Sequence, residues 1–293
     1  MRGRHATLAP LLFAAGVACA MDPAPLWDFL RPELSEERFR EALATAQGDD
    51  ALVLQTQIAR TYGLRRDFAR ARELLGEIEP RVRSAGPEAR ARWWLETGRT
   101  HASATHAPEA LTAASKDAAR AAYLRALGIA SGARLDALAI DALHMMAFVD
   151  TAPAEQLKWG EQALRIAAAS AQPEAQRWEA ALRNNVGYAL HQLGRHEEAL
   201  AQFRAAVELR RRGANAQALR TAQWMVAWTL RALARHDEAL ALQLALEREG
   251  DAAGAPDPHV FEELEILYRV RGDAPRAAHY AERRRAARPQ SPP

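Results

Sequence analysis

The sequence predicts an all-α protein built from repeated pairs of helices. Its apolar residues recur at helical spacing, while the alternation of a half-buried strand is absent over any useful length. Alanine is abundant and β-branched residues are scarce, as in helical proteins. The run 195–200 also recurs almost unchanged at 235–240, forty residues later. Such an echo is typical of an array in which each pair of helices stacks on the next.

The stretch Asn184–Leu209 shows one such pair most clearly, with two amphipathic helices separated by a turn at Gly194. Each helix carries its apolar and small residues at i, i+3, i+4 and i+7 spacing, which places them on one stripe. Gly187 and Ala199 let the two helices approach, and Phe203 fills the space beside them. The stripe residues are Leu182, Val186, Gly187, Ala189, Leu190 and Leu193, then Ala199, Leu200, Phe203, Ala206, Val207 and Leu209.

This pattern resembles the tetratricopeptide repeat, which has a small residue in its first helix and an alanine and an aromatic residue in its second. Two signature positions depart from it, because Arg183 stands in place of tryptophan and Arg211 in place of proline. The resemblance implies an α-solenoid, a right-handed superhelix of about six helix pairs with an N-terminal capping helix. It also implies a non-catalytic scaffold that binds a protein or peptide in its concave groove.

The repeats are longer than the basic 34-residue unit. The small residue of each second helix serves as a marker, and successive markers lie 37 to 48 residues apart. The second repeat has a long linker, His101–Ser115, and the third is the most degenerate, with Gln156 and Gly160 in place of alanine and an aromatic residue. The markers are Ala71, Ala119, Gln156, Ala199, Ala239 and Ala277.

Residues 51–287 therefore form the predicted solenoid, and residues 21–50 form a lead-in and a capping helix. The proline-rich stretch 22–34 predicts an extended lead-in. Ser35 is the predicted N-cap of the capping helix, whose apolar edge is Phe39, Leu43 and Ala46. Residues 288–293 predict a disordered tail.

Residues 1–20 have the layout of a secretory signal peptide. Arg2 and Arg4 precede an apolar run from Leu8 to Val17, and Ala18-Cys19-Ala20 provides the small residues of a cleavage site. The run is too short to span a membrane. This interpretation predicts a periplasmic or secreted protein, and the alternative is a cytoplasmic protein whose true start is Met21.

The charge balance argues against nucleic acid and anionic membranes as partners. The formal net charge is +2, and Arg2 and Arg4 account for all of it, so the rest of the chain is neutral. Cys19 is the single cysteine, which excludes an internal disulfide and a cysteine-based zinc site. We therefore predict neither metal nor cofactor.

Catalytic motifs are absent from the sequence, which contains no HExxH, no phosphate-binding glycine loop and no GxSxG. His101 and His106 lie close together in the long linker and could share a metal, or they could be two solvated loop histidines. A ligand sensor or an enzyme centred on this linker is thus one alternative function. A structural module for oligomerisation is another.

The predicted binding surface lies on the first helix of each pair, where positions about i, i+3, i+7 and i+10 face the groove of such arrays. It would have aromatic walls, arginines and an amide, which are side chains that contribute much of the energy of binding. Trp224 and Trp228 could instead pack between consecutive repeats. The predicted groove residues are Arg60, Arg99, Asn184, Tyr188, His191, Trp224, Trp228 and Arg231.

Overall fold

The computed structural model describes residues 21–287, which form helices joined by turns and contain no strand. The predicted signal peptide and C-terminal tail lie outside the described residues. We call the first helix of each pair the A helix and the second the B helix. The six pairs are α2 (Gly48–Leu64) and α3 (Phe68–Val82); α4 (Pro87–Arg99) and α5 (Ala113–Gly132); α6 (Asp136–Met145) and α7 (Pro153–Ala169); α9 (Glu179–Gln192) and α10 (His196–Arg211); α11 (Ala216–Ala232) and α12 (His236–Ala252); α13 (Pro258–Val270) and α14 (Ala274–Ala287).

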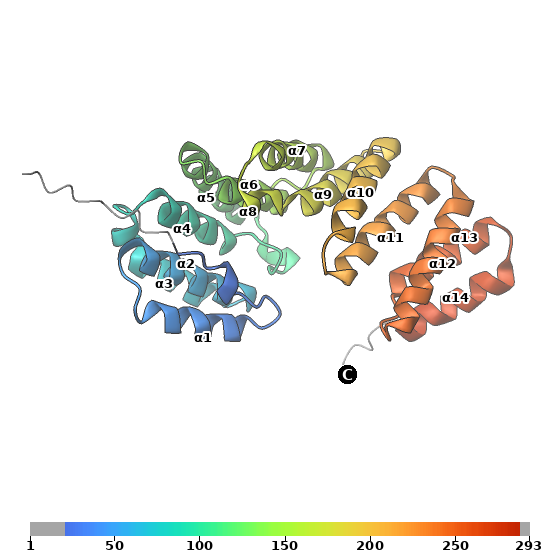
Figure 1. Cartoon of the computed structure of the whole chain (residues 1–293), viewed down its shortest axis with the longest axis horizontal. Helices are drawn as coiled ribbons and strands as arrows, with labels where there is room; N and C mark the ends of the chain where they lie inside the picture. Colours follow the sequence, from blue (N-terminus) through green and yellow to red (C-terminus); the bar gives the residue numbers. More distant parts are fainter. Residues whose placement is uncertain (1–20, 288–293) are drawn as a thin grey trace, which may run out of the picture.

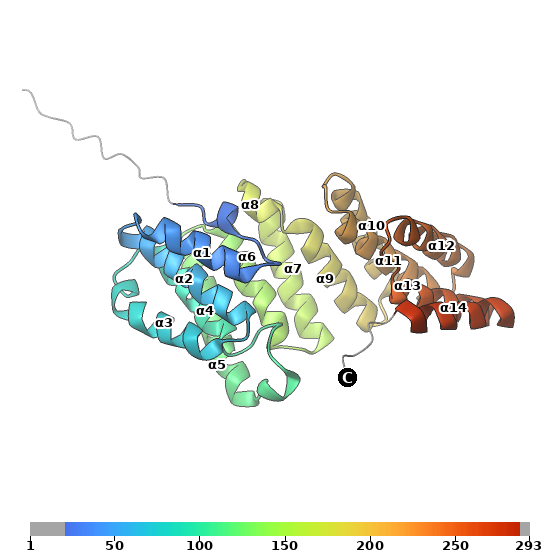
Figure 2. The ribbon, with the colours of Figure 1, turned by 90° about the horizontal axis from the view of Figure 1, so that it is seen from below.

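The pairs follow one another along an arch, with α6 and α9 nearer its inner side than α5 and α7 (Figure 1). The capping helix α1 (Pro32–Leu43) packs on α2, and the short helix α8 (Pro173–Gln176) contacts α6 and α7. The connection between α4 and α5 projects from the row of helices (Figure 2). The predicted all-α solenoid of six pairs with a capping helix is confirmed. No helix among residues 21–287 is long and apolar enough to cross a membrane.

Most A helices end in the same left-handed turn. In the fourth pair, Gly194 has a φ of 75° and the amide of Arg195 donates to the carbonyl of Leu190 at 2.9 Å. This hydrogen bond closes a Schellman motif, which uses a carbonyl that the helix leaves free. Ala234 occupies the same turn position forty residues later with a φ of 59°, although a side chain disfavours this conformation. The hydrogen-bonding pattern, not the glycine alone, therefore maintains the turn.

A glycine facing an aromatic ring sets the spacing of two helix pairs. A Cβ atom added at Gly187 would lie 2.7 Å from Cε1 of Phe203, and one added at Gly98 would lie 2.4 Å from Cε1 of Tyr123. Both rings are fully buried. Since real Cβ atoms do not approach an aromatic ring so closely, only glycine allows these helices to pack at this distance. The predicted contact between Gly187 and Phe203 is confirmed.

We expect Gly187→Ala to destabilise the protein by about 1–3 kcal/mol, because the added methyl group overpacks the contact with Phe203. Gly128→Ala is the matched control, since Gly128 is also helical but has open space around its Cα. It should instead stabilise the protein by about 0.5–1 kcal/mol through helix propensity. Thermal unfolding followed by circular dichroism measures both. Equal changes in the two variants would contradict the proposed contact.

The fifth pair departs from this arrangement at Gln243, which stands where the fourth pair has Phe203. Ala227 occupies the position equivalent to Gly187, so its methyl group takes part of the space that an aromatic ring would need. Gln243 is fully buried, and neither its Oε1 nor its Nε2 has a hydrogen-bond partner among residues 21–287. A buried amide without partners costs free energy.

Replacing Gln243 by leucine should therefore stabilise the protein by about 1–3 kcal/mol, because the buried polar atoms are removed. Gln57→Leu is the control, because Gln57 is equally buried but its amide accepts from Trp27 and donates to Thr56. That variant should be less stable than the wild type. Melting temperatures that move in the same direction for both variants would show that the partners of the amide do not decide the outcome.

Two predictions about local structure are wrong, namely the N-cap at Ser35 and the wholly extended lead-in. Ser35 is not an N-cap, because α1 begins three residues earlier at Pro32, and the Ser35 hydroxyl instead contacts the backbone of Asp28 within the core. The proline fits the first helical turn because its missing N–H is not needed there. In the third pair the marker Gln156 is only half-buried, and α7 buries Leu157, Ala163 and Ala167. The lead-in is also not wholly extended, since Ala24–Leu26 forms a 3₁₀ turn.

Candidate functional site

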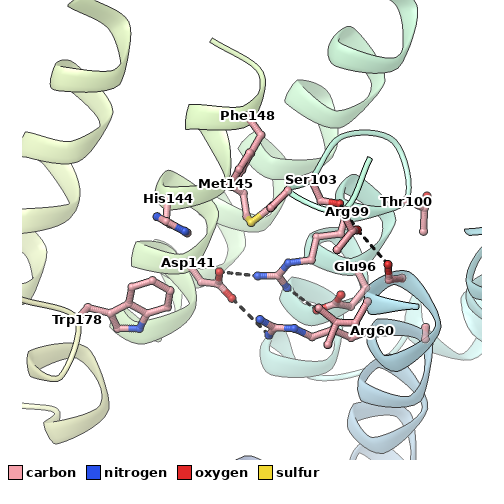
Figure 3. Close-up of a pocket in the computed structure, with 15 residues that line it drawn as sticks. Arg60, Glu96, Arg99, Thr100, Ser103, Asp141, His144, Met145, Phe148 and Trp178 are labelled. Atoms are coloured by element: carbon pink, nitrogen blue, oxygen red, sulfur yellow. Dashed lines mark hydrogen bonds and ion pairs between the residues drawn. The ribbon is translucent and has the colours of Figure 1, made fainter. Parts of the chain in front are cut away.

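A cavity of about 200 Å³ lies among α2, α4, α6 and the connection between α4 and α5 (Figure 3). Two of the predicted groove residues, Arg60 and Arg99, line it. Its other walls combine apolar, hydroxyl and charged side chains. These include Ala59, Leu64, Glu96, Thr100, Ser103, Thr105, Asp141, His144, Met145, Phe148 and Trp178.

Arg99 is fully engaged by two buried carboxylates. It donates to Glu96 on its own helix and to Asp141 on α6, and all three residues are buried. Burial by itself raises the pKa of Asp141, but the charges of Arg99 and Arg60 outweigh it and lower the pKa. The carboxylate therefore stays ionised, and Arg99 is a structural member of the cavity wall, not a free groove residue as predicted.

Arg60 is held differently. Its Nη1 lies 4.0 Å from Oδ2 of Asp141, beyond hydrogen-bond distance, and its guanidinium lies 5.4 Å from the ring centroids of Trp27 and Phe29. The two rings stack on each other at 4.6 Å, and Nε1 of Trp27 donates to Gln57 on α2. This hydrogen bond attaches the lead-in to α2, and the aromatic rings of the lead-in contact the Arg60 cation.

The long linker closes one side of the cavity, but not with its histidines. Thr105 donates to the carbonyl of Gly63 at 3.0 Å, which ties the linker to the end of α2. His106 stacks on Phe68 with ring centroids 3.8 Å apart, and its Nδ1 lies 2.9 Å from the hydroxyl of Ser103. Residues 21–287 contain no group of three potential metal ligands. His106 therefore orders the linker, and Ser103, Ala104 and Thr105 are the linker residues that line the cavity.

A second feature is a row of aromatic side chains along the A helices of the last three pairs. Trp228 on α11 stacks on His191 and Tyr188 of α9, with ring centroids 3.4 and 6.0 Å apart. Trp224 stacks on Trp228 at 5.8 Å and meets His259 of α13 edge-on at 6.1 Å. We call these five residues the aromatic row. Tyr188 is 43% exposed, and the two tryptophans are half-buried.

The aromatic row joins successive repeats and also faces solvent. Trp224 and Trp228 pack between repeats, as one of the two alternatives has it, and they are not fully buried. Beyond Trp224 a hollow of about 530 Å³ opens among α11, α12 and α13, lined in part by Pro256, His259 and Leu246. Trp224 and His259 belong to the aromatic row and also line the hollow, so the two features adjoin each other.

Arg231 and Asn184 flank the aromatic row, and only Arg231 is already engaged by another repeat. Arg231 makes a two-pronged ion pair with Glu263 of α13, with N–O distances of 2.6 and 2.9 Å. Its guanidinium therefore joins two repeats and is not free for a partner. Asn184 lies one turn before Tyr188 on α9, and its buried Oδ1 has no hydrogen-bond partner among the described residues. Asn185 contacts His144 at 3.2 Å and links α9 to the cavity wall.

The stack on Trp228 keeps His191 neutral. Burial lowers the pKa of the His191 imidazole to about 4, with smaller contributions from the neighbouring His196 and Arg231. In the unfolded chain the same group titrates near pH 6.5. The folded state therefore has its full stability above pH 6.5 and loses part of it as the pH falls towards 4, because the unfolded chain takes up the proton first.

We expect His191→Phe to reduce the loss of melting temperature between pH 7 and pH 4.5, because phenylalanine keeps a ring against Trp228 without titrating. The carboxylates that titrate in the same range are common to both proteins. His279→Phe on α14, where His279 is exposed, should leave the loss unchanged. An equal loss in the wild type and in His191→Phe would show that His191 does not couple folding to pH.

The eight predicted groove residues thus fall into two separate places. Arg60 and Arg99 belong to the cavity, while the other six belong to the aromatic row or flank it. Sequence reasoning missed Asp141, Trp178 and the lead-in residues Trp27 and Phe29. Asp141 had a signal, since it is a single acid within the otherwise apolar run 137–143. The position of Trp27 against α2 depends on the course of the lead-in, and no pattern in the sequence predicts that course.

Comparison with known proteins supports this architecture. A family model described as tetratricopeptide repeat matches residues 178–245, and no curated protein sequence matches the chain. Among solved structures, the chain is similar to a signal transduction ATPase with numerous domains from Pyrococcus horikoshii, which has a tetratricopeptide repeat sensor. The TM-score is 0.67 at 13% identity, over 87% of this chain and only 39% of that one.

Two further structures match over most of both chains with lower TM-scores. BtubC (BKLC) from P. vanneervenii is 16% identical over 90% of this chain and 94% of its own, with a TM-score of 0.41. NprR in complex with its cognate peptide NprX is 14% identical over 87% of this chain and 84% of its own, with a TM-score of 0.42. The family model therefore identifies tetratricopeptide repeats at residues 178–245, and helix pairs of the same architecture make up the other described repeats.

Proposed function

We propose that this protein is a non-catalytic scaffold that binds a protein or peptide segment on its A-helix face, with the aromatic row as the main contact. The observation that carries the proposal is the row itself. Tyr188 and Trp228 belong to different repeats, yet their rings are stacked and both remain in part accessible to solvent. Aromatic side chains that are already ordered lose little conformational freedom on binding and often dominate interfaces.

The surroundings of the row favour an extended segment with apolar side chains. Arg231 is neutralised by Glu263, so the row itself carries no strong net charge that would select a charged partner. The hollow beside Trp224 offers room for a large side chain at one end of the row. An extended peptide that crosses α9, α11 and α13 would thus place its side chains against rings and in the hollow.

Selection of peptides from a random library tests the proposal directly. Peptides are selected against the wild-type protein, and their affinities are measured by fluorescence anisotropy. Trp228→Ala should weaken binding of the selected peptides by about 30-fold or more, equivalent to about 2 kcal/mol at a dominant contact. Tyr188→Ala should weaken it as well, with a smaller change in melting temperature than a buried aromatic residue would give, because that side chain is 43% exposed.

Leu124→Ala provides the matched control, because Leu124 is 43% exposed, like Tyr188, but lies on the B helix α5. Its binding should equal that of the wild type. Circular dichroism confirms that each variant is folded before its affinity is interpreted. Selected peptides that bind Trp228→Ala and Tyr188→Ala as tightly as the wild type would contradict the assignment of the aromatic row as a binding surface.

A further inference from the structure

The cavity near the N-terminal end contains a cation that lacks a hydrogen-bonding partner. Among residues 21–287, the guanidinium of Arg60 makes no hydrogen bond, and its nearest carboxylate oxygen is the Oδ2 of Asp141 at 4.0 Å. The neighbouring Arg99, in contrast, donates to both Glu96 and Asp141. Arg99 engages Oδ1 of Asp141, while Oδ2 faces Arg60 as an ion pair without a hydrogen bond, so the donors of Arg60 remain available at the cavity wall (Figure 3).

Arg60 is also prevented from turning freely to solvent. Its side chain is only 24% exposed, and the stacked rings of Trp27 and Phe29 lie beside its guanidinium. A largely buried charge without a hydrogen-bonded partner is unfavourable, and a carboxylate is the group that best matches the planar donors of arginine. Arg60 therefore presents ordered donors whose geometry matches a carboxylate group.

The remaining walls define the rest of the ligand. Met145, Phe148 and Trp178 provide apolar surface, and the hydroxyl groups of Ser103 and Thr105 lie on the linker side. The volume of about 200 Å³ is smaller than the pocket of a drug-sized ligand. It suits a body of about the size of one amino-acid residue.

We propose that this cavity binds a small apolar carboxylate, with Arg60 as the carboxylate receptor and Met145, Phe148 and Trp178 as the apolar walls. The site goes beyond the proposed function, because it lies on α2, α4, α6 and the residue preceding α9, whereas the aromatic row lies on α9, α11 and α13. The formal charges of Arg60, Arg99, Glu96 and Asp141 cancel. Recognition of the carboxylate therefore depends on directed hydrogen bonds from Arg60, not on a general positive field.

Isothermal titration calorimetry with two acids and their amides tests the proposal. The probes are N-acetyl-leucine and N-acetyl-phenylalanine, each compared with its primary amide, which has the same apolar body without the charge. We expect at least one acid to bind, and to bind at least tenfold more tightly than its amide. Arg60→Gln should abolish this preference. It should leave the fold intact, because Arg60 makes no hydrogen bond to the described chain and Asp141 keeps Arg99.

Arg183→Gln is the matched control, because Arg183 is 26% exposed on the A helix α9 and lies outside the cavity. It should retain the preference for the acid. No binding of either acid at millimolar concentration, equal binding of acids and amides, or an unchanged preference in Arg60→Gln would each overturn the proposal. A negative result for the cavity would not contradict the proposed peptide binding, since the test of that proposal rests on Tyr188 and Trp228.

One further titration distinguishes a free small acid from the C-terminus of a peptide as the source of the carboxylate. The pentapeptide Ala-Ala-Ala-Ala-Leu with a free C-terminus is compared with the better-binding N-acetyl amino acid. Weaker or equal binding of the pentapeptide supports a free small acid as the ligand. Binding at least tenfold tighter overturns that source and assigns the carboxylate to the end of a peptide chain.

Discussion

The close packing of the two helices within each pair is the constraint on which the rest of this structure depends. A single helix with one apolar stripe has nothing to bury that stripe against, so the A and B helices must first close on each other. At Gly187 and Gly98 the backbone approaches an aromatic ring so closely that no side chain fits between them. This distance fixes how far apart the outer faces of the pair lie, and therefore how the next pair stacks.

Departures from that packing explain the irregular parts of the molecule. In the fifth pair Ala227 occupies the glycine position, and a buried glutamine replaces the ring, at a cost in unsatisfied polar atoms. In the second pair the ring is retained in Tyr123, whose hydroxyl donates to the carbonyl of Ala102 at the start of the long linker. The aromatic residue of this pair thus also anchors the connection that closes the cavity.

The two candidate sites differ in whether their charged groups are fully paired. Around the aromatic row, Arg231 and Glu263 neutralise each other, and burial keeps His191 neutral, so the surface attracts through stacking and apolar contact. In the cavity, four ionised groups lie close together and only Arg60 lacks hydrogen bonds. The first arrangement favours an apolar segment, and the second favours a ligand with one well-placed carboxylate.

Periodicity and the echo between 195–200 and 235–240 were sufficient to predict the helices, the number of pairs and the contact between Gly187 and Phe203. These features depend on residues close in sequence, whose spacing directly determines which helical face they share. The A-helix positions of Tyr188 and Trp228 followed from the same spacing. Their stacking across two repeats did not, because it depends on the angle between pairs.

Only the tertiary structure decided which charges are free. Arg60, Arg99 and Arg231 look alike in the sequence, yet Arg99 is held by Asp141, forty-two residues away, and Arg231 by Glu263, thirty-two residues away. Arg60 instead meets the rings of the lead-in. The sequence by itself determined the repeated helix pairs, because local spacing governs them. The identity of the available cation was decided by the fold, because ion pairing depends on side chains that only the stacking of distant helices brings together.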